Sequence, residues 1–223
     1  KLLGLPDAPD DGGEFDLVVI GGGLAGTCAA ISAARQGLTV ALVQDRPVLG
    51  GNGSSEVRVW PEGKTNFAPY PHIGDIVTEL IAPVEKKGTL NGSSAGNFDD
   101  ARKLRIVGAE SRIRLLTEHH ANAVEMDGKR IAAVVAQSTR TARRIKLRGK
   151  FFADCTGDAT VGYLAGADYE FSIGNNMGSS NLWRPLDVAD QAQVLQCECK
   201  DKDVLTAACL AGKTEKPFPR CPW

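Results

Sequence analysis

The sequence has no excess of either charge and no long run of strongly apolar residues, and these absences exclude several classes of protein. Its 26 basic and 27 acidic residues give a formal net charge of −1, so no overall field draws the chain toward nucleic acid or anionic lipid. The uncharged stretch 17–34 is rich in Gly and Ala, and acidic residues precede it, where a signal peptide needs positive charge. We therefore expect no nucleic-acid and no membrane partner.

Cysteine is also sparse, with 6 residues in a chain of 223. Their spacing matches neither a small disulfide scaffold nor a zinc site, so no metal is expected. Cys28 and Cys155 fall in apolar segments, where we expect them to pack in the core. The other cysteines lie in the C-terminal tail: Cys197, Cys199, Cys209 and Cys221.

The location of the protein stays open. The cytoplasm is favoured. Because the chain begins at Lys1 rather than Met, we expect that the natural N-terminus has been removed, and export with a disulfide in the tail remains an alternative.

The N-terminal third has the order strand, glycine turn, helix, strand. Residues 1–13 are rich in Pro, Asp and Gly and predict an extended leader. The apolar, β-branched run 15–20 predicts a buried parallel strand. Small residues over 24–36 predict a helix that Gly37 ends, and 38–43 predicts a second buried strand. These elements fill about 30 residues, the size of a βαβ unit.

A glycine pattern lies between the first predicted strand and the helix. Gly21, Gly23 and Gly26 form a GxGxxG motif in the context that gives the motif meaning. The first glycine permits a tight turn, the second lets backbone approach a pyrophosphate, and the third lets helix and strand pack closely. The pyrophosphate then lies at the helix N-terminus, beside Leu24 and Ala25. The alternative is a glycine turn without a ligand.

The same motif calls for an acidic residue at the end of the second strand, to bind a ribose hydroxyl. The strand register places Gln44 there, with Asp45 next to it. Gln44 is able to donate and accept hydrogen bonds, and Asp45 is the alternative ligand of the ribose. Because no Arg replaces the acid, NADP is not indicated.

A second glycine-rich segment follows in a long loop. Its small residues would let the chain pass close to a bound cofactor, with N–H groups and hydroxyls facing phosphate. The alternative is a flexible surface turn. The candidate residues are Gly50, Gly51, Asn52, Gly53 and Ser54.

The rest of the chain predicts helices near 73–87, where Pro83 interrupts the pattern, and near 98–107, followed by a series of short strands. Asp127-Gly128 predicts a hairpin turn. The predicted strands are 114–118, 121–126, 131–137, 143–147 and 151–155.

Several of these motifs together resemble a known family. DLVVIGGGLAGTCAAISAARQG, then LTVALVQDRPVLGGN, then a strand meander, then FFADCTGDATVGYLAGA are similar to the FAD-dependent oxidoreductases of the glutathione-reductase-like class. The likeness is strongest to members related to heterodisulfide reductase A, thiazole synthase and fumarate-reductase flavoproteins. It covers roughly residues 15–169.

The resemblance implies an α/β fold of the Rossmann-like FAD/NAD(P)-binding type, with three layers, a central parallel sheet and a β-meander. It implies that the glycine motif binds the FAD pyrophosphate, and that Arg46 and the second glycine segment run along it toward the flavin. It implies that Ala121 lies near adenine, and that Thr156, Gly157 and Asp158 close the meander beside the ADP part. Apart from the resemblance, Thr-Gly-Asp after a buried strand is typical of the point where a strand passes into a loop. The alternative to a cofactor-binding role is therefore a purely structural one.

Catalytic candidates are few because flavin itself carries the redox chemistry. Glu56, Arg58 and Trp60 alternate as in a strand, and Arg58 is a candidate for binding an anionic group. His72 is a candidate proton donor. The alternatives are a surface salt bridge for Arg58 and a purely structural helix-entry histidine. We expect His119 and His120 to be strand-edge residues.

We predict three segments: the leader 1–13, an FAD-binding domain over 14–170, and the start of a substrate or linker region over 171–223. No substrate domain is recognised, so we expect an N-terminal fragment that is inactive by itself.

The predicted function of the whole protein is FAD-dependent oxidation or reduction of an unidentified small organic substrate. The main alternative is a dinucleotide-binding module in which FAD or NAD has a structural or regulatory role. A tRNA-modifying flavoprotein and an NAD-only dehydrogenase are further alternatives. A tRNA enzyme would need a basic surface, which the net charge of −1 does not favour. The sequence leaves the oligomeric state open.

Overall fold

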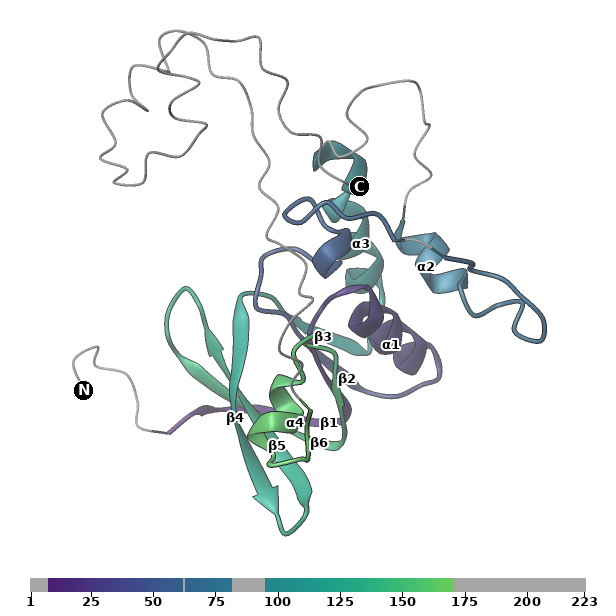
Figure 1. Cartoon of the computed structure of the whole chain (residues 1–223). Helices are drawn as coiled ribbons and strands as arrows, with labels where there is room; N and C mark the ends of the chain where they lie inside the picture. Colours follow the sequence, from purple (N-terminus) through teal and green to yellow (C-terminus); the bar gives the residue numbers. More distant parts are fainter. Residues whose placement is uncertain (1–7, 62, 82–94, 171–223) are drawn as a thin grey trace, which may run out of the picture. The chain divides into compact units, whose positions relative to one another are not determined.

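A computed structural model describes residues 8–61, 63–81 and 95–170 (Figure 1). The predicted interruption at Pro83, the tail cysteines and the segment 171–223 lie outside the described residues. No helix within those residues has the length and apolar character needed to cross a membrane. The elements, in chain order, are β1 (Asp10–Ile20), α1 (Leu24–Arg35), β2 (Val40–Val43), η1 (Gly51–Gly53), α2 (Asp75–Leu80), η2 (Ala95–Phe98), α3 (Asp100–Ala109), β3 (Ile113–Leu116), β4 (His119–Asp127), β5 (Arg130–Ser138), β6 (Arg144–Asp154) and α4 (Thr160–Leu164).

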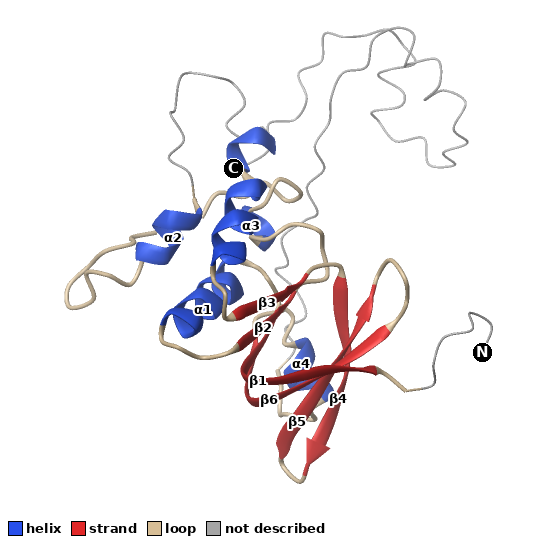
Figure 2. Cartoon of the chain, turned by 180° about the vertical axis from the view of Figure 1, so that it is seen from behind, coloured by secondary structure: helices blue, strands red, loops and turns tan. Residues whose placement is uncertain are grey.

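The strands form a 6-stranded sheet in the order β3-β2-β1-β6-β5-β4 (Figure 2). β1 pairs in parallel with β2 and with β6, and β2 pairs in parallel with β3. β4, β5 and β6 form an antiparallel meander. β6 therefore belongs both to the meander and to the parallel part of the sheet. The predicted α/β fold with a central parallel sheet is confirmed.

The two faces of the parallel strands are buried against different partners. Val19, Val40 and Leu42 pack with α1 and with residues of α2 and α3. The alternate residues of the same strands, such as Val18 and Ala41, pack with the meander and α4. Because side chains alternate along a strand, burial of both faces requires continuous apolar runs, as these strands have. The chain thus has the three layers predicted: helices, parallel strands and meander.

Two predicted boundaries were wrong. β1 begins at Asp10 rather than Phe15, so residues 10–13 belong to the sheet and not to a leader. The residues predicted as two strands, 143–147 and 151–155, form the single strand β6. The polar start of β1 pairs with β6 across a bulge, and pairs such as Arg148–Asp11 at 2.8 Å accompany it. Cross-strand charge pairs therefore extend the sheet where the apolar pattern stops.

The predicted hairpin turn and the helices predicted over 24–36 and near 98–107 are confirmed, whereas the helix predicted near 73–87 ends at Leu80 within the described residues. The hairpin at Asp127-Gly128 joins β4 to β5, with Gly128 in the left-handed region at φ +60°. α3 begins after Asp99, whose carboxylate accepts from the Arg102 N–H at 3.0 Å. Arg35 of α1 links the helical layer, since its guanidinium bonds Glu79 of α2 at 2.8 Å and Glu110, just after α3, at 2.7 Å.

α1 approaches β1 closely at one point. A Cβ atom at Gly26 would lie 1.9 Å from the Gly21 carbonyl oxygen, a distance that no side chain can occupy. This contact confirms the predicted role of Gly26 in close packing of helix and strand. Cys28 and Cys155 pack against the same apolar cluster, as predicted, and burial raises the pKa of both thiols.

We predict that Gly26→Ala lowers the free energy of unfolding by about 1–3 kcal/mol, because the added methyl must push α1 away from β1. Gly108→Ala is the matched control, since a Cβ at Gly108 meets nothing within 4 Å in helix α3. The control should be neutral or stabilising by up to about 1 kcal/mol. Urea unfolding of both variants measures the difference, and equal stabilities would contradict the packing argument.

Candidate functional site

The glycine turn carries the chain from β1 into α1 with its backbone exposed. Gly21 has φ +103°, and a Cβ there would lie 2.2 Å from the Cys155 carbonyl oxygen. Gly23 differs, because a Cβ at this position would meet nothing within 4 Å. Gly21 is thus required by local packing, whereas the space beside Gly23 is open.

The first turn of α1 has no side-chain cap. Gly23 is the N-cap residue, no side chain caps the helix, and the first turn contains no acidic residue. The first backbone hydrogen bond of the helix runs from the Thr27 N–H to the Gly23 carbonyl at 2.9 Å. The N–H groups that precede it have no acceptor within the helix. Together with the helix dipole, they make this end of α1 suited to an anion.

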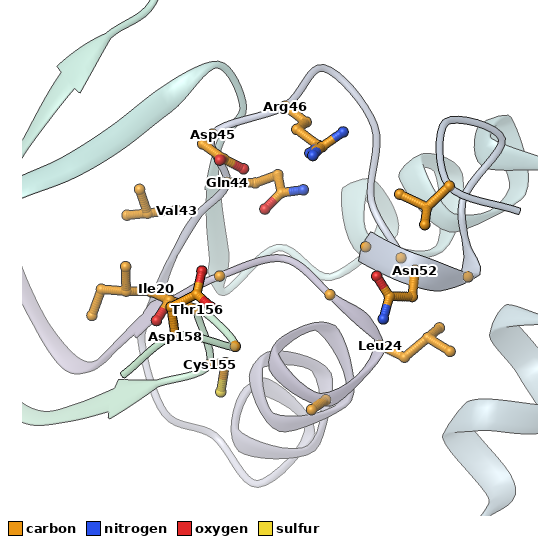
Figure 3. A pocket seen from close by; sticks show the side chains of 18 of the residues that line it. Ile20, Leu24, Val43, Gln44, Asp45, Arg46, Asn52, Cys155, Thr156 and Asp158 are labelled. Atoms are coloured by element: carbon orange, nitrogen blue, oxygen red, sulfur yellow. The ribbon is translucent and has the colours of Figure 1, made fainter. Parts of the chain in front are cut away.

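A cavity of about 770 Å³ opens over this helix end. Figure 3 shows Thr156 and Asp158 beside Ile20, and Asn52 and Leu24 on the opposite side. The lining comes from the ends of β1, β2 and β4, from the glycine turn and start of α1, from the loop after β2, and from the loop after β6 with the start of α4. It comprises Ile20, Gly21, Gly23, Leu24, Ala25, Val43, Gln44, Asp45, Arg46, Gly50, Gly51, Asn52, Gly53, Val57, Val59, Trp60, Pro61, His119, His120, Ala121, Cys155, Thr156, Gly157, Asp158 and Thr160.

Most residues predicted to bind the cofactor line this cavity, but Gly26 and Ser54 do not. Gly26 acts through packing, as described above. Ser54 is buried, and its hydroxyl donates to the Gly51 carbonyl at 2.7 Å. That hydroxyl therefore stabilises the loop and does not face a ligand.

Gln44 lies at the predicted ribose position, and both ends of its side-chain amide are hydrogen-bonded within the protein. The residue is 4% exposed. Its Oε1 accepts from the Gly22 N–H at 2.9 Å, and its Nε2 donates to the Val48 carbonyl at 3.0 Å. Gln44 thus ties the glycine turn to the loop after β2. A carboxylate could not make the second bond, which explains an amide in place of an acid.

Asp45 and Arg46 lie at the exposed rim of the cavity. The Arg46 guanidinium pairs with the Glu56 carboxylate at 2.9 Å, and this bond raises the pKa of Arg46. Asp45 is the carboxylate next to the predicted ribose position. Of the two ribose candidates, Asp45 is therefore the one whose side chain is exposed at the cavity.

The second glycine segment lies directly against the first. The Gly50 N–H donates to the Gly22 carbonyl at 2.8 Å, and Gly23 and Gly50 form a parallel bridge. Gly50 has φ +109°, and a Cβ at Gly51 would lie 3.1 Å from the Gly23 Cα. Only backbone fits between the two segments. The prediction of a close-approach loop, rather than a free surface turn, agrees with this geometry.

Asp154, at the end of β6, organises the loop of Thr156, Gly157 and Asp158. Its carboxylate accepts from the Thr156 hydroxyl at 2.7 Å and from the Gly162 N–H at 2.9 Å. Partial burial opposes ionisation, yet these hydrogen bonds hold the pKa of Asp154 below its usual value. Because its hydroxyl already donates to Asp154, Thr156 mainly shapes the wall of the cavity.

The meander closes the remaining side of the cavity. Ala121 lines it as predicted, and so do His119 and His120, which were expected to be edge residues only. The His119 N–H donates to the Gln44 carbonyl at 2.9 Å, which brings the start of β4 beside the end of β2. The position of both histidines directly before Ala121 in one strand is the signal that could have indicated them.

Arg58 and His72 do not line the cavity. The predicted strand over residues 56–60 is wrong, because Arg58 has φ +64° and its N–H donates to the Ser54 carbonyl at 2.8 Å, which makes a turn. The Arg58 Nε donates to the Ser55 carbonyl at 2.7 Å. His72 is 84% exposed and lies 3.0 Å from Asp75. Their predicted catalytic roles gain no support from the geometry.

Comparison with known protein families places the chain in one of them. Residues 16–216 match the profile of the family described as FAD dependent oxidoreductase. The chain belongs to this family. Membership confirms the predicted cofactor, FAD, and the predicted class, flavin-dependent oxidoreductases.

Individual relatives cover smaller parts of the chain. The dihydrolipoyl dehydrogenase of Trypanosoma brucei brucei is 29% identical over 129 residues, which are 52% of this chain and 27% of the relative. The glycerol-3-phosphate dehydrogenase of Mycobacterium leprae is 44% identical over 50 residues, 22% of this chain and 8% of the relative. The chain thus spans about a quarter or less of these relatives.

Solved structures of flavoproteins are also similar. The glycerol-3-phosphate dehydrogenase of Bacillus halodurans, solved in complex with FAD, has a TM-score of 0.46 and 19% identity, and the match covers 69% of this chain and 37% of the other.

We predict that Gln44→Glu lowers the free energy of unfolding by about 1–3 kcal/mol, because a carboxylate would face the Val48 carbonyl without a proton to donate. Gln36→Glu applies the same change at an exposed position at the end of α1 and should cost less than about 1 kcal/mol. Thermal unfolding at neutral pH compares them. If the two variants lose the same stability, Gln44 does not have the linking role assigned to it.

Proposed function

We propose that the described part of this chain binds FAD with its pyrophosphate on the N-terminus of α1, and that the whole protein uses the flavin to oxidise or reduce a small organic substrate. The observation that carries this proposal is the combination of an uncapped helix end with open space beside Gly23. Open space by itself also occurs beside other glycines, such as Gly37 and Gly128, but at Gly23 it coincides with the uncapped first turn of a helix and with the cavity over it. Family membership supports the nature of the cofactor.

The cavity offers a different chemistry to each part of the dinucleotide. The N–H groups at Leu24 and Ala25 suit the phosphates. The carboxylate of Asp45 suits a ribose hydroxyl. The small side chain of Ala121 leaves room for a flat base beside the meander. We therefore assign the ADP part of FAD to the side of the cavity between α1, β2 and β4.

Within this arrangement the protein contributes binding and orientation. FAD, when bound, supplies the hydride or electron transfer. Gln44 and Asp154 hold the two loops that contact the cofactor, through the hydrogen bonds described above. The exposed pair of Arg46 and Glu56 lies at the rim. No proton donor for a substrate is assigned among the described residues.

We predict that Gly23→Val weakens FAD binding by at least about 100-fold, because its side chain would occupy the space that the pyrophosphate needs and remove charge-assisted hydrogen bonds. The variant should still fold, since a Cβ at Gly23 clashes with nothing. Gly108→Val, at an exposed position of α3, is the matched control. Calorimetric titration of each folded chain with FAD gives the affinities.

Two outcomes would contradict the proposal. If Gly23→Val bound FAD with wild-type affinity, the pyrophosphate would not bind at the start of α1. Tight FAD binding to the full-length protein without reduction by any donor would favour the structural or regulatory alternative.

A further inference from the structure

We propose that Trp60 forms the wall of the cavity against which the isoalloxazine ring of the flavin lies. This inference rests on the proposed FAD site and names a contact for the half of the cofactor that the glycine motif does not bind.

Apolar side chains line the cavity beside the second glycine loop. Val57, Val59, Trp60 and Pro61 line this part. The Val59 N–H donates to the Asn52 carbonyl at 2.9 Å, so the segment is tied to the second glycine loop. Another part of the lining is joined to β4, because the His119 N–H donates to the Gln44 carbonyl. The two parts of the cavity therefore differ, and the part with Trp60 adjoins the second glycine loop.

Trp60 is held in place by a stacked aromatic pair. Its ring and that of Phe98 have centroids 4.5 Å apart and an interplanar angle of 25°. Phe98 is itself 5% exposed, so the pair is anchored in the protein and not on its surface. Because the indole is already held in place, little side-chain entropy is lost when a ligand binds against it.

The support of this pair extends to the glycine loop. The carbonyl of Phe98 accepts a hydrogen bond from the ammonium group of Lys103, which is 1% exposed. That ammonium group also lies 3.3 Å from the Asp100 carboxylate, and Asp100 accepts from the Ser55 N–H at 3.2 Å. The Lys103 stem is so close to Gly50 that a Cβ there would lie 2.9 Å from its Cε.

These contacts let one small region of α3 position both Trp60 and the second glycine loop. The N–H groups at the start of α1 suit phosphate and the Asp45 carboxylate suits ribose, whereas a flat indole suits a flat apolar ring. Once the ADP part occupies the side near β2 and β4, the flavin ring is the group left for the part that contains Trp60.

The test compares FAD with ADP, which lacks the flavin. Wild type, Trp60→Ala, Trp60→Phe and Tyr163→Ala are titrated with each ligand by calorimetry. Trp60→Ala should weaken FAD binding by about tenfold and leave ADP binding unchanged, because ADP lacks the ring that is proposed to contact Trp60. Trp60→Phe, which keeps an aromatic wall, should bind FAD within about threefold of wild type. Tyr163→Ala removes an exposed aromatic outside the cavity and should change neither affinity.

The emission of bound flavin gives a second readout. Contact with an indole quenches flavin fluorescence, so the emission should rise in Trp60→Ala. An equal loss of ADP and FAD affinity would show that Trp60 only supports the loop, and unchanged FAD affinity in Trp60→Ala would show no ring contact. Either result overturns the inference and leaves the FAD site intact. If wild type binds neither ligand, the proposed function fails and the inference fails with it.

Discussion

The close approach of backbone to backbone around the start of α1 is the constraint on which the rest of the site depends. Gly26 touches the Gly21 carbonyl, and Gly50 and Gly51 lie against Gly22 and Gly23. Side chains are excluded from these contacts, so the amide groups of the first helical turn stay accessible. An anion-binding surface made of backbone follows from this packing.

Hydrogen bonds of a few polar side chains keep this backbone surface in position. Gln44 connects the glycine turn with the loop after β2, and Asp154 orders the loop after β6. The Lys103 ammonium donates to the Phe98 carbonyl, and its stem packs close to Gly50. These side chains come from different layers of the fold. The cavity is therefore preorganised by the same contacts that join the layers.

The sequence predicted the fold and the glycine motif because both depend on local pattern: buried runs on both faces, and glycine where only backbone fits. The predictions from sequence were wrong or incomplete where contacts between distant residues determine the structure. Three features depend on partners distant in sequence or on an unusual backbone angle: the pairing of Asp10 and Asp11 with β6, the turn at Arg58, and the hydrogen bond of the Gln44 amide to Gly22. Trp60 was predicted to lie on the same strand face as Arg58. The fold shows that Trp60 lines the cavity and that Arg58 does not.

The most direct test of the account is the response of individual amide groups to a ligand. ¹⁵N–¹H spectra of the chain recorded with increasing ADP should show the largest shifts at Gly23, Leu24, Ala25 and Gly26, because phosphate oxygens would accept hydrogen bonds from this turn. If ADP binds and shifts amides elsewhere while these four stay unchanged, the phosphate site does not lie at the start of α1, and the central claim is wrong.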